Sequence, residues 1–503
     1  MLPLVLTMRI EVQMVIIADD GTRQEQLITT LQREAPRAET LGLTLAESKE
    51  ILQQTQQVLI GHQIAAYLTQ QRPCPACATP RRIKQQATAP FRTLFGRVDV
   101  ANPRWYHCRC QSQSAKTLRP LAQLLPERTS PELRYLETTW ARRVSYELTA
   151  RLLHAVLPIN ATHSAITVRN HLLHDARRLE QQMGDDRVMV WDSCQAERDR
   201  LPIPDGPLAV GLDGAIIRAR RGSCGAQTAN LFAVIAGKSI LAFRRDAPEG
   251  VPPTSKCFAL VQRYDTKPRR RLFDLLQAQG MQANQQVTFF THGGETVRRL
   301  PEDLYPQAEH ILDWFHLTMR ITVLQQCARG VPARTPPWTG SDDRSERSLE
   351  RRLESVKHDL WHGNTHGALE ELGILDDILE GWGYDDDGNP TQQPGHEAAV
   401  RMGKYVGELA TYIANNAGSI VNYGERYRQG ERMSTGFVES TVNQVVSKRM
   451  VKKQQMQWTP EGAHLLLQVR TQVINDDWEA TVRSWYPGFR PGQVGAAPAR
   501  AGG

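Results

Sequence analysis

The 503-residue sequence lacks any uninterrupted apolar run of about 18 residues, the length that a membrane-spanning helix requires. Its apolar first residues, MLPLVLTMRIEVQMVII, have no basic start and are interrupted by Arg9 and Glu11, so we expect no secretory signal. Apolar residues make up 40% and charged residues 23%, as in folded proteins. We therefore exclude a membrane bundle and a mostly disordered chain, and expect a cytoplasmic protein without a membrane partner.

Several catalytic fingerprints are also missing. The sequence has no GxxxxGK[ST] phosphate loop, no dinucleotide-binding glycine motif and no GxSxG serine elbow. An ordinary metabolic α/β enzyme therefore has little support. The formal net charge of +7 is a modest excess that permits a polyanionic partner without requiring one.

Cysteines are few, and eight in 503 residues are too few for a disulfide scaffold. Four of them form two tight pairs, Cys74 with Cys77 and Cys108 with Cys110. Tetrahedral Zn²⁺ needs four such ligands, and a hairpin through FRTLFGRVDV could bring the pairs together. This predicts a structural zinc ribbon, with two alternatives: His107 replaces one cysteine, or the four cysteines are buried without metal.

The N-terminal region begins with MRIEVQMVII, whose alternation predicts a strand. Thr44 and Glu47 have the spacing of a capping box, which predicts that a helix begins there. Leu45, Leu52 and Leu59 form an apolar stripe along this helix. The helix either packs on its own domain or forms a dimerising coiled coil.

Residues 131–183 contain two helical runs separated by a break near Pro158. The second run carries polar side chains that include Arg169, Asn170 and Arg177. In a helix-turn-helix, the first helix supports a second helix whose exposed polar side chains contact bases in the major groove of DNA. The two helical runs fit this pattern. A purely structural helical bundle would have the same pattern.

A carboxylate lies at the centre of an apolar, strand-like run, AVGLDGAIIRAR, as Asp213. Such a carboxylate is costly unless it is paired or binds a cation. Further strand-like runs, QVTFFTHGGE and AEHILDWFH, alternate with helical ones, which predicts an α/β sheet. The chain is therefore expected to be multidomain, α/β plus α.

Glu439 is another candidate site residue. It lies early in a predicted helix that begins in the run STGFVESTVNQVVSKRM. A basic stretch follows it. A carboxylate that binds a metal ion, followed by cationic side chains that bind a nucleic-acid strand, is suited to phosphoryl transfer. A solvated helix face is the plainer alternative. The basic residues are Lys448, Arg449, Lys452 and Lys453.

The order of these motifs resembles that of bacterial insertion-sequence transposases of the ISKra type, which are DDE enzymes distantly similar to the Mutator-like group. The resemblance covers roughly residues 70–487, and its most specific parts are GLDG, DWFH and GFVES with its trailing Trp. It implies an RNase H-like catalytic core with a helical insertion. The expected divisions are an N-terminal strand and helix region (1–70), a zinc-ribbon-like module (71–127), a helix-turn-helix domain (128–185), a catalytic core (205–327 and 426–487), the insertion (328–425) and a disordered tail (488–503).

The resemblance also assigns roles within the site. Asp213 corresponds to the first acid and Glu439 to the third, while His292 stands where the family has its second acid. Asp313 and His316 match an acid-x-x-His motif of the Mutator-like relatives, with the expected role of shaping the site. The family mechanism needs two divalent ions, Mg²⁺ or Mn²⁺, for DNA cleavage and strand transfer.

The histidine at position 292 is the main departure from the family pattern, because a neutral imidazole is a poor Mg²⁺ ligand. It is natural decay, a deliberate inactivation or a working variant, and Glu295, three residues on, is a candidate substitute. The resemblance implies double-stranded DNA as the partner, a nucleoid location and a homodimer or larger assembly that holds two DNA ends. The alternatives are a DNA-binding regulator without chemistry and another RNase H-like nuclease.

Overall fold

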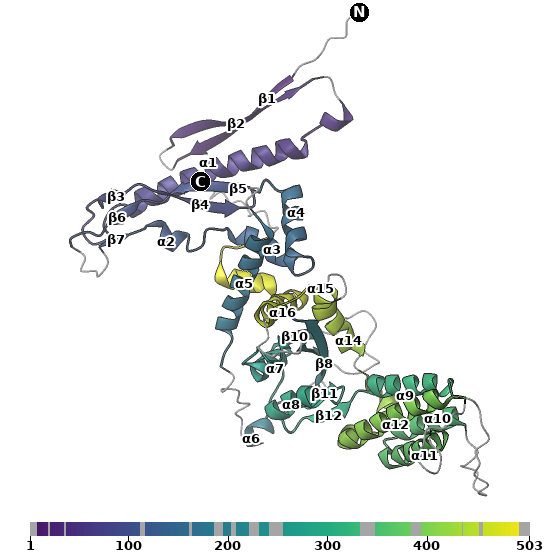
Figure 1. Cartoon of the computed structure of the whole chain (residues 1–503). Helices are drawn as coiled ribbons and strands as arrows, with labels where there is room; N and C mark the ends of the chain where they lie inside the picture. The colour runs from purple at the N-terminus through teal and green to yellow at the C-terminus, as the bar shows by residue number, and fades with distance from the viewer. Residues whose placement is uncertain are drawn as a thin grey trace, which may run out of the picture. The chain divides into compact units, whose positions relative to one another are not determined.

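The computed structural model shows a mixed α/β protein (Figure 1). It describes residues 8–18, 21–34, 37–110, 116–159, 163–185, 195–202, 208–220, 231–240, 255–331, 348–383, 394–434, 436–451 and 456–491. The chain forms two compact units, Met1–Ala176 with Asp477–Gly503, and Arg177–Asp476. The tail expected to be disordered lies, from residue 492, outside the described residues.

The first unit opens with the predicted strand and helix. Strand β1 (Met8–Ile17) pairs antiparallel with β2 (Arg23–Arg33), and helix α1 covers Leu45–Gln71. Glu47 donates its N–H to the Thr44 hydroxyl at 3.3 Å, and its carboxylate accepts the Thr44 N–H at 2.9 Å. The strand and the capping box at the helix start are thus both confirmed.

The predicted leucine stripe of α1 does not pack on its own domain. Leu45, Leu52 and Leu59 are 58%, 41% and 43% exposed. The helix instead buries Ile60 and Ile64 in a small core that lies near its C-terminal end. The predicted packing of the helix on its own domain is therefore confirmed, although Ile60 and Ile64 make this contact and the three leucines do not. The coiled coil stays a prediction. The other core residues are Val98, Val100 and Leu121.

The cysteine-containing module is made of short strands. A hairpin of β4 and β5 covers the predicted FRTLFGRVDV run and places a left-handed glycine, Gly96 with φ +112°, at its turn. A three-stranded sheet, in the order β3-β6-β7, lies beside it in the sequence. The bounds are β3 Ile83–Gln85, β4 Thr88–Thr93, β5 Gly96–Ala101, β6 Arg104–Tyr106 and β7 Thr117–Leu118.

Helices complete the first unit. The first predicted helical run is two helices, because residues 142–145 form a turn and Ser145 caps the second helix through the N–H of Leu148. Ion pairs join α3 to α5, where Arg134 contacts Asp175 and Glu137 contacts His171. The bounds are α2 Leu121–Leu124, α3 Pro131–Ala141, α4 Tyr146–Val156, α5 Ala165–Gln182 and α17 Trp478–Trp485.

The second unit is built on a five-stranded mixed sheet in the order β10-β9-β8-β11-β12. Strand β9 runs antiparallel to both β10 and β8, whereas β11 runs parallel to both β8 and β12. The predicted α/β sheet is therefore present. The bounds are β8 Leu208–Arg218, β9 Leu231–Ile240, β10 Ser255–Val261, β11 Val287–Thr291 and β12 Glu309–Leu312.

Helices pack against this sheet. Apolar residues of α7 and α8 share one core with β8, β10 and β11, while α16 packs on β10 and α14 on β8 and β9. A π-helical turn, Asn443–Ser447, follows α14 directly. The bounds are α6 Gln195–Arg198, α7 Pro268–Ala278, α8 Glu295–Leu304, α14 Gly436–Val442, α15 Lys448–Met450 and α16 Pro460–Ile474.

The region between β12 and α14 is helical, as the sequence predicts. Helices α9 to α12, green in Figure 1, share one continuous apolar core. No described helix is long and apolar enough to cross a membrane. The bounds are α9 Trp314–Ala328, α10 Leu349–Trp361, α11 Thr365–Gly383, α12 His396–Asn416 and α13 Tyr423–Arg428.

Candidate functional site

Asp213 lies in the middle of the sheet. Strand β8 is flanked by β9 and β11, and Asp213 is only 9% exposed within it. Its Oδ1 accepts the N–H of Gly214 at 2.7 Å. Within the part of the chain that the structure describes, no second hydrogen bond to this carboxylate is found, so its other lone pairs can accept a proton donor or bind a cation.

His292 directly follows β11, the parallel neighbour of β8. Because Thr291 pairs with Leu212, the next residue of each strand, His292 and Asp213, come together at the same end of the sheet. His292 Nε2 lies 3.9 Å from Asp213 Oδ1. Its other ring nitrogen, Nδ1, accepts the N–H of Gly294 at 3.1 Å, which fixes the orientation of the ring.

Asp313 and His316 form a pair at the start of α9, directly after β12. Asp313 is fully buried and caps the helix by accepting the N–H groups of Phe315 and His316. Its Oδ2 also lies 2.5 Å from His316 Nδ1. The His316 ring centroid is 5.8 Å from that of His292. Asp313 therefore holds the His316 imidazole beside His292, which directly follows β11.

Glu439 lies on α14, which packs against β8, and its side chain is exposed. Burial acts to lower the pKa of His316, but the hydrogen bond and charge of Asp313 and the charges of Asp213 and Glu439 outweigh it, so this pKa is raised. Carboxylates from three distant segments thus act on one imidazole.

The four paired cysteines form a group that could bind a metal ion such as zinc. All their sulfur atoms lie within 4.8 Å of one another, and Cys77 lies 3.4 Å from both Cys108 and Cys110. Zn–S bonds of about 2.3 Å in a tetrahedron place the sulfur atoms about 3.8 Å apart, close to this spacing. Cys77 is exposed, and His107 is not in the group, so neither alternative to four cysteine ligands is supported.

One other group in the described residues brings three metal-ligand side chains this close: Glu180, Asp265 and His464. A guanidinium already fills its centre, since Arg271 donates to Asp265 at 2.7 Å and to Glu180 at 2.6 Å. This group is therefore a buried ion-pair network. Only the KPRRR run of residues 267–271 signals it in the sequence, and that run does not identify its partners.

The predicted DNA contacts differ in exposure. Arg169 and Asn170 are exposed on α5, and Lys448 is exposed on α15. Arg177, also exposed, pairs with Glu461 at 2.7 Å.

The predicted DNA contact at Arg449 is wrong. Arg449 is 3% exposed, and its guanidinium lies 5.3 Å from the ring centroid of Trp458. Stacking on an indole in the interior leaves no surface for a phosphate. Lys452 and Lys453 lie outside the described residues.

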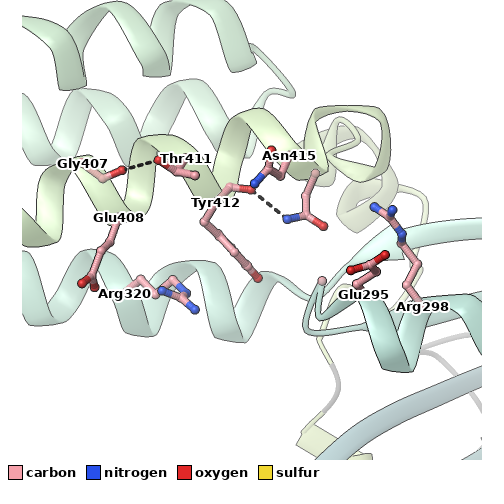
Figure 2. A pocket seen from close by; sticks show the side chains of 10 residues that line it. Glu295, Arg298, Arg320, Gly407, Glu408, Thr411, Tyr412 and Asn415 are labelled. Carbon is pink, nitrogen blue, oxygen red and sulfur yellow. Dashed lines mark hydrogen bonds between the residues drawn. The ribbon is translucent and has the colours of Figure 1, made fainter.

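An open groove of about 800 Å³ lies next to His292 and was not predicted (Figure 2). Tyr412 of α12 donates its hydroxyl to the His292 carbonyl at 2.8 Å, and the Arg320 guanidinium stands 4.2 Å from the Tyr412 ring centroid. Glu295 lines the groove and pairs with Arg299. The groove thus joins the helical region to the β11 end. Its other lining residues include Arg298, Thr411 and Asn415.

Comparisons with known proteins give no further assignment, because no protein-family model matches the chain and a search of curated proteins found no match.

Proposed function

We propose that this chain is a DDE-type transposase of a bacterial insertion sequence, which binds the ends of its element and cleaves and joins DNA strands with divalent ions. One observation carries the proposal. Asp213 within β8, His292 directly after β11 and the Asp313–His316 pair directly after β12 lie on three adjacent strands, and the charge of Glu439 reaches the His316 imidazole. Residues that approach from remote segments to one sheet edge are typical of a catalytic site.

The topology supports the RNase H-like part of the proposal. Three antiparallel strands continued by two parallel strands, with the first strand in the centre, are expected of an RNase H-like sheet. The helical region between β12 and α14 stands where the resemblance implies an insertion. The proposed core is therefore residues 205–327 and 426–487, with 328–425 inserted.

The site residues have distinct proposed roles. Two divalent ions, when bound, would activate the attacking hydroxyl and stabilise the leaving oxygen of the DNA strand. Asp213 and Glu439 would hold these ions through their carboxylates. Asp313 keeps the His316 ring in place. Lys448, which follows Glu439 by two and a half helical turns, is exposed and can contact a phosphate.

DNA binding is proposed for the first unit and for the basic residues near α14. Arg169 and Asn170 are exposed on one helix that is joined to α3 by ion pairs, as a recognition helix requires. A homodimer or larger assembly is part of the proposal, because two DNA ends must be held at once. Exposed Leu45, Leu52 and Leu59 of α1 are a candidate contact.

The test uses a labelled duplex cut from the DNA that flanks the protein's own gene, in Mg²⁺ and in Mn²⁺. We expect metal-dependent cleavage that Asp213→Asn and Glu439→Gln each abolish while DNA binding is retained. The His292→Asp variant is expected to cleave faster in Mg²⁺. Inert wild-type and His292→Asp proteins that still bind the duplex would refute the enzymatic proposal.

A DNA-binding protein without chemistry is the second candidate. The hydrogen bond from the Gly294 N–H to His292 Nδ1 favours it, because this bond makes Nε2 the protonated nitrogen of the neutral ring. His292 then offers Asp213 a hydrogen-bond donor and not a metal ligand. Cleavage by the unmodified chain excludes this candidate.

A further inference from the structure

The two histidines of the site are bound to the protein in opposite ways. At His292, Nδ1 accepts a backbone N–H, so the lone pair of Nδ1 is used and the neutral ring carries its hydrogen on Nε2. That hydrogen faces Asp213 Oδ1, 3.9 Å away. A cation could bind Nε2 only after the hydrogen moved to Nδ1, and this would break the hydrogen bond to Gly294.

His316 has the reverse arrangement. Its Nδ1 lies 2.5 Å from the Asp313 carboxylate, which can only accept, so Nδ1 carries the hydrogen and Nε2 keeps a lone pair. Metal-binding histidines usually donate their second ring nitrogen to a carboxylate in this manner. Asp313 itself is fully buried and already accepts two backbone N–H groups, so it orients the ring and does not face a cation.

We propose that His316, through Nε2, fills the ligand position at which the second acid of a DDE site is expected, and that His292 does not. This inference rests on the proposed function. When divalent ions are bound, the carboxylates of Asp213 and Glu439 and the Nε2 of His316 would supply their ligands.

The donor set predicts the metal. Mg²⁺ strongly prefers oxygen ligands, whereas Mn²⁺ accepts imidazole nitrogen beside carboxylates. The site is therefore expected to bind Mn²⁺ more tightly than Mg²⁺, and replacement of His316 by aspartate is expected to reduce that preference.

The test measures Mn²⁺ binding to the full-length, zinc-loaded chain by calorimetry and by the ¹⁴N modulation of the Mn²⁺ electron spin echo. Wild-type protein and His292→Ala are expected to show the imidazole signal and to differ in affinity by less than about threefold. His316→Ala and the size-matched His316→Gln are expected to lose the signal and to bind at least about tenfold more weakly. Asp313→Asn keeps the His316 ring but removes the carboxylate that orients it. Its Mn²⁺ affinity is expected to lie between those of the wild-type protein and His316→Gln.

The outcomes separate the two proposals. A signal that persists in His316→Gln but disappears in His292→Ala overturns the assignment of His316 and leaves a metal-dependent transposase intact. Mn²⁺ binding that Asp213→Asn does not weaken overturns the metal-dependent function itself. Circular dichroism of each variant shows whether it is folded, and the glutamine variant serves where alanine unfolds the protein.

Discussion

His310 connects the stability of the second unit to pH. Its Nε2 lies 2.8 Å from the Thr291 hydroxyl, next to His292, and its Nδ1 lies 2.7 Å from the Ser419 hydroxyl. Burial, and then the charge of Arg298, lowers the pKa of His310 from 6.5 to about 4. The neutral imidazole therefore helps to hold together the ends of β11 and β12 from which the candidate site is built.

The sign of the pH effect follows from this direction. Above pH 6.5 the imidazole is neutral in both the folded and the unfolded chain, so it has no differential effect. As the pH falls from 6.5 towards 4, His310 binds a proton in the unfolded chain but stays neutral in the folded chain, so the folded state loses stability. At pH 5 the loss is at most about 2 kcal/mol relative to pH 7.5, or about 30-fold in an opening equilibrium.

Amide hydrogen exchange of peptides that cover β11 and β12 measures this opening locally, after correction for the intrinsic pH dependence. Wild-type protein is expected to lose up to about 30-fold more protection between pH 7.5 and pH 5 than His310→Gln, which cannot be protonated. His366→Gln, at an exposed site on α11, is the matched control and is expected to behave as wild type. Equal losses in wild type and His310→Gln would refute the reasoning.

Three further predictions concern metal, DNA and burial. Removal of zinc by a chelator, or Cys77→Ser, is expected to increase deuterium uptake in β3 to β7 and to leave the second unit unchanged, because a closed cysteine site stabilises only its own module. Lys448→Ala is expected to reduce the slope of log affinity for duplex DNA against log salt by about 0.9, whereas buried Arg449→Ala is expected to lower thermal stability and leave the slope unchanged. Arg271→Met leaves the buried Asp265 carboxylate without this partner and is expected to lower the free energy of unfolding by about 3–5 kcal/mol, measured by denaturant unfolding. An unchanged denaturation midpoint would contradict this.

Features set by neighbouring residues could be predicted from the sequence. The capping box at Thr44, the hairpin between the cysteine pairs, the strand that contains Asp213 and the strand that precedes His292 depend on short-range spacing and alternation. The approach of Asp213 to His292 is expected from the family resemblance, and the parallel pairing of β11 with β8 brings the two residues together.

Features set by long-range packing could not be predicted. Arg449 belongs to a basic run, and nothing local shows that Trp458 covers its guanidinium. Arg271 is one of three consecutive arginines, and its partners Glu180 and His464 are 91 and 193 residues away. Contacts such as these depend on which faces of distant helices meet, and a single sequence contains no periodic signal for that choice.

The residue at position 292 affects both the electrostatic repulsion at Asp213 and the negative charge of the candidate site. A second carboxylate about 4 Å from Asp213 would repel it by about 4 kcal/mol at an effective dielectric constant of 20 when no cation is bound. The neutral His292 ring removes that repulsion and turns a donor towards Asp213. Under the proposed function, a histidine at this position gives up one negative charge that would attract divalent ions. Under the proposed assignment of His316 as a ligand, the Asp313–His316 pair offsets part of this deficit, because a buried carboxylate strengthens the imidazole as a ligand without placing a further charge on the surface of the site.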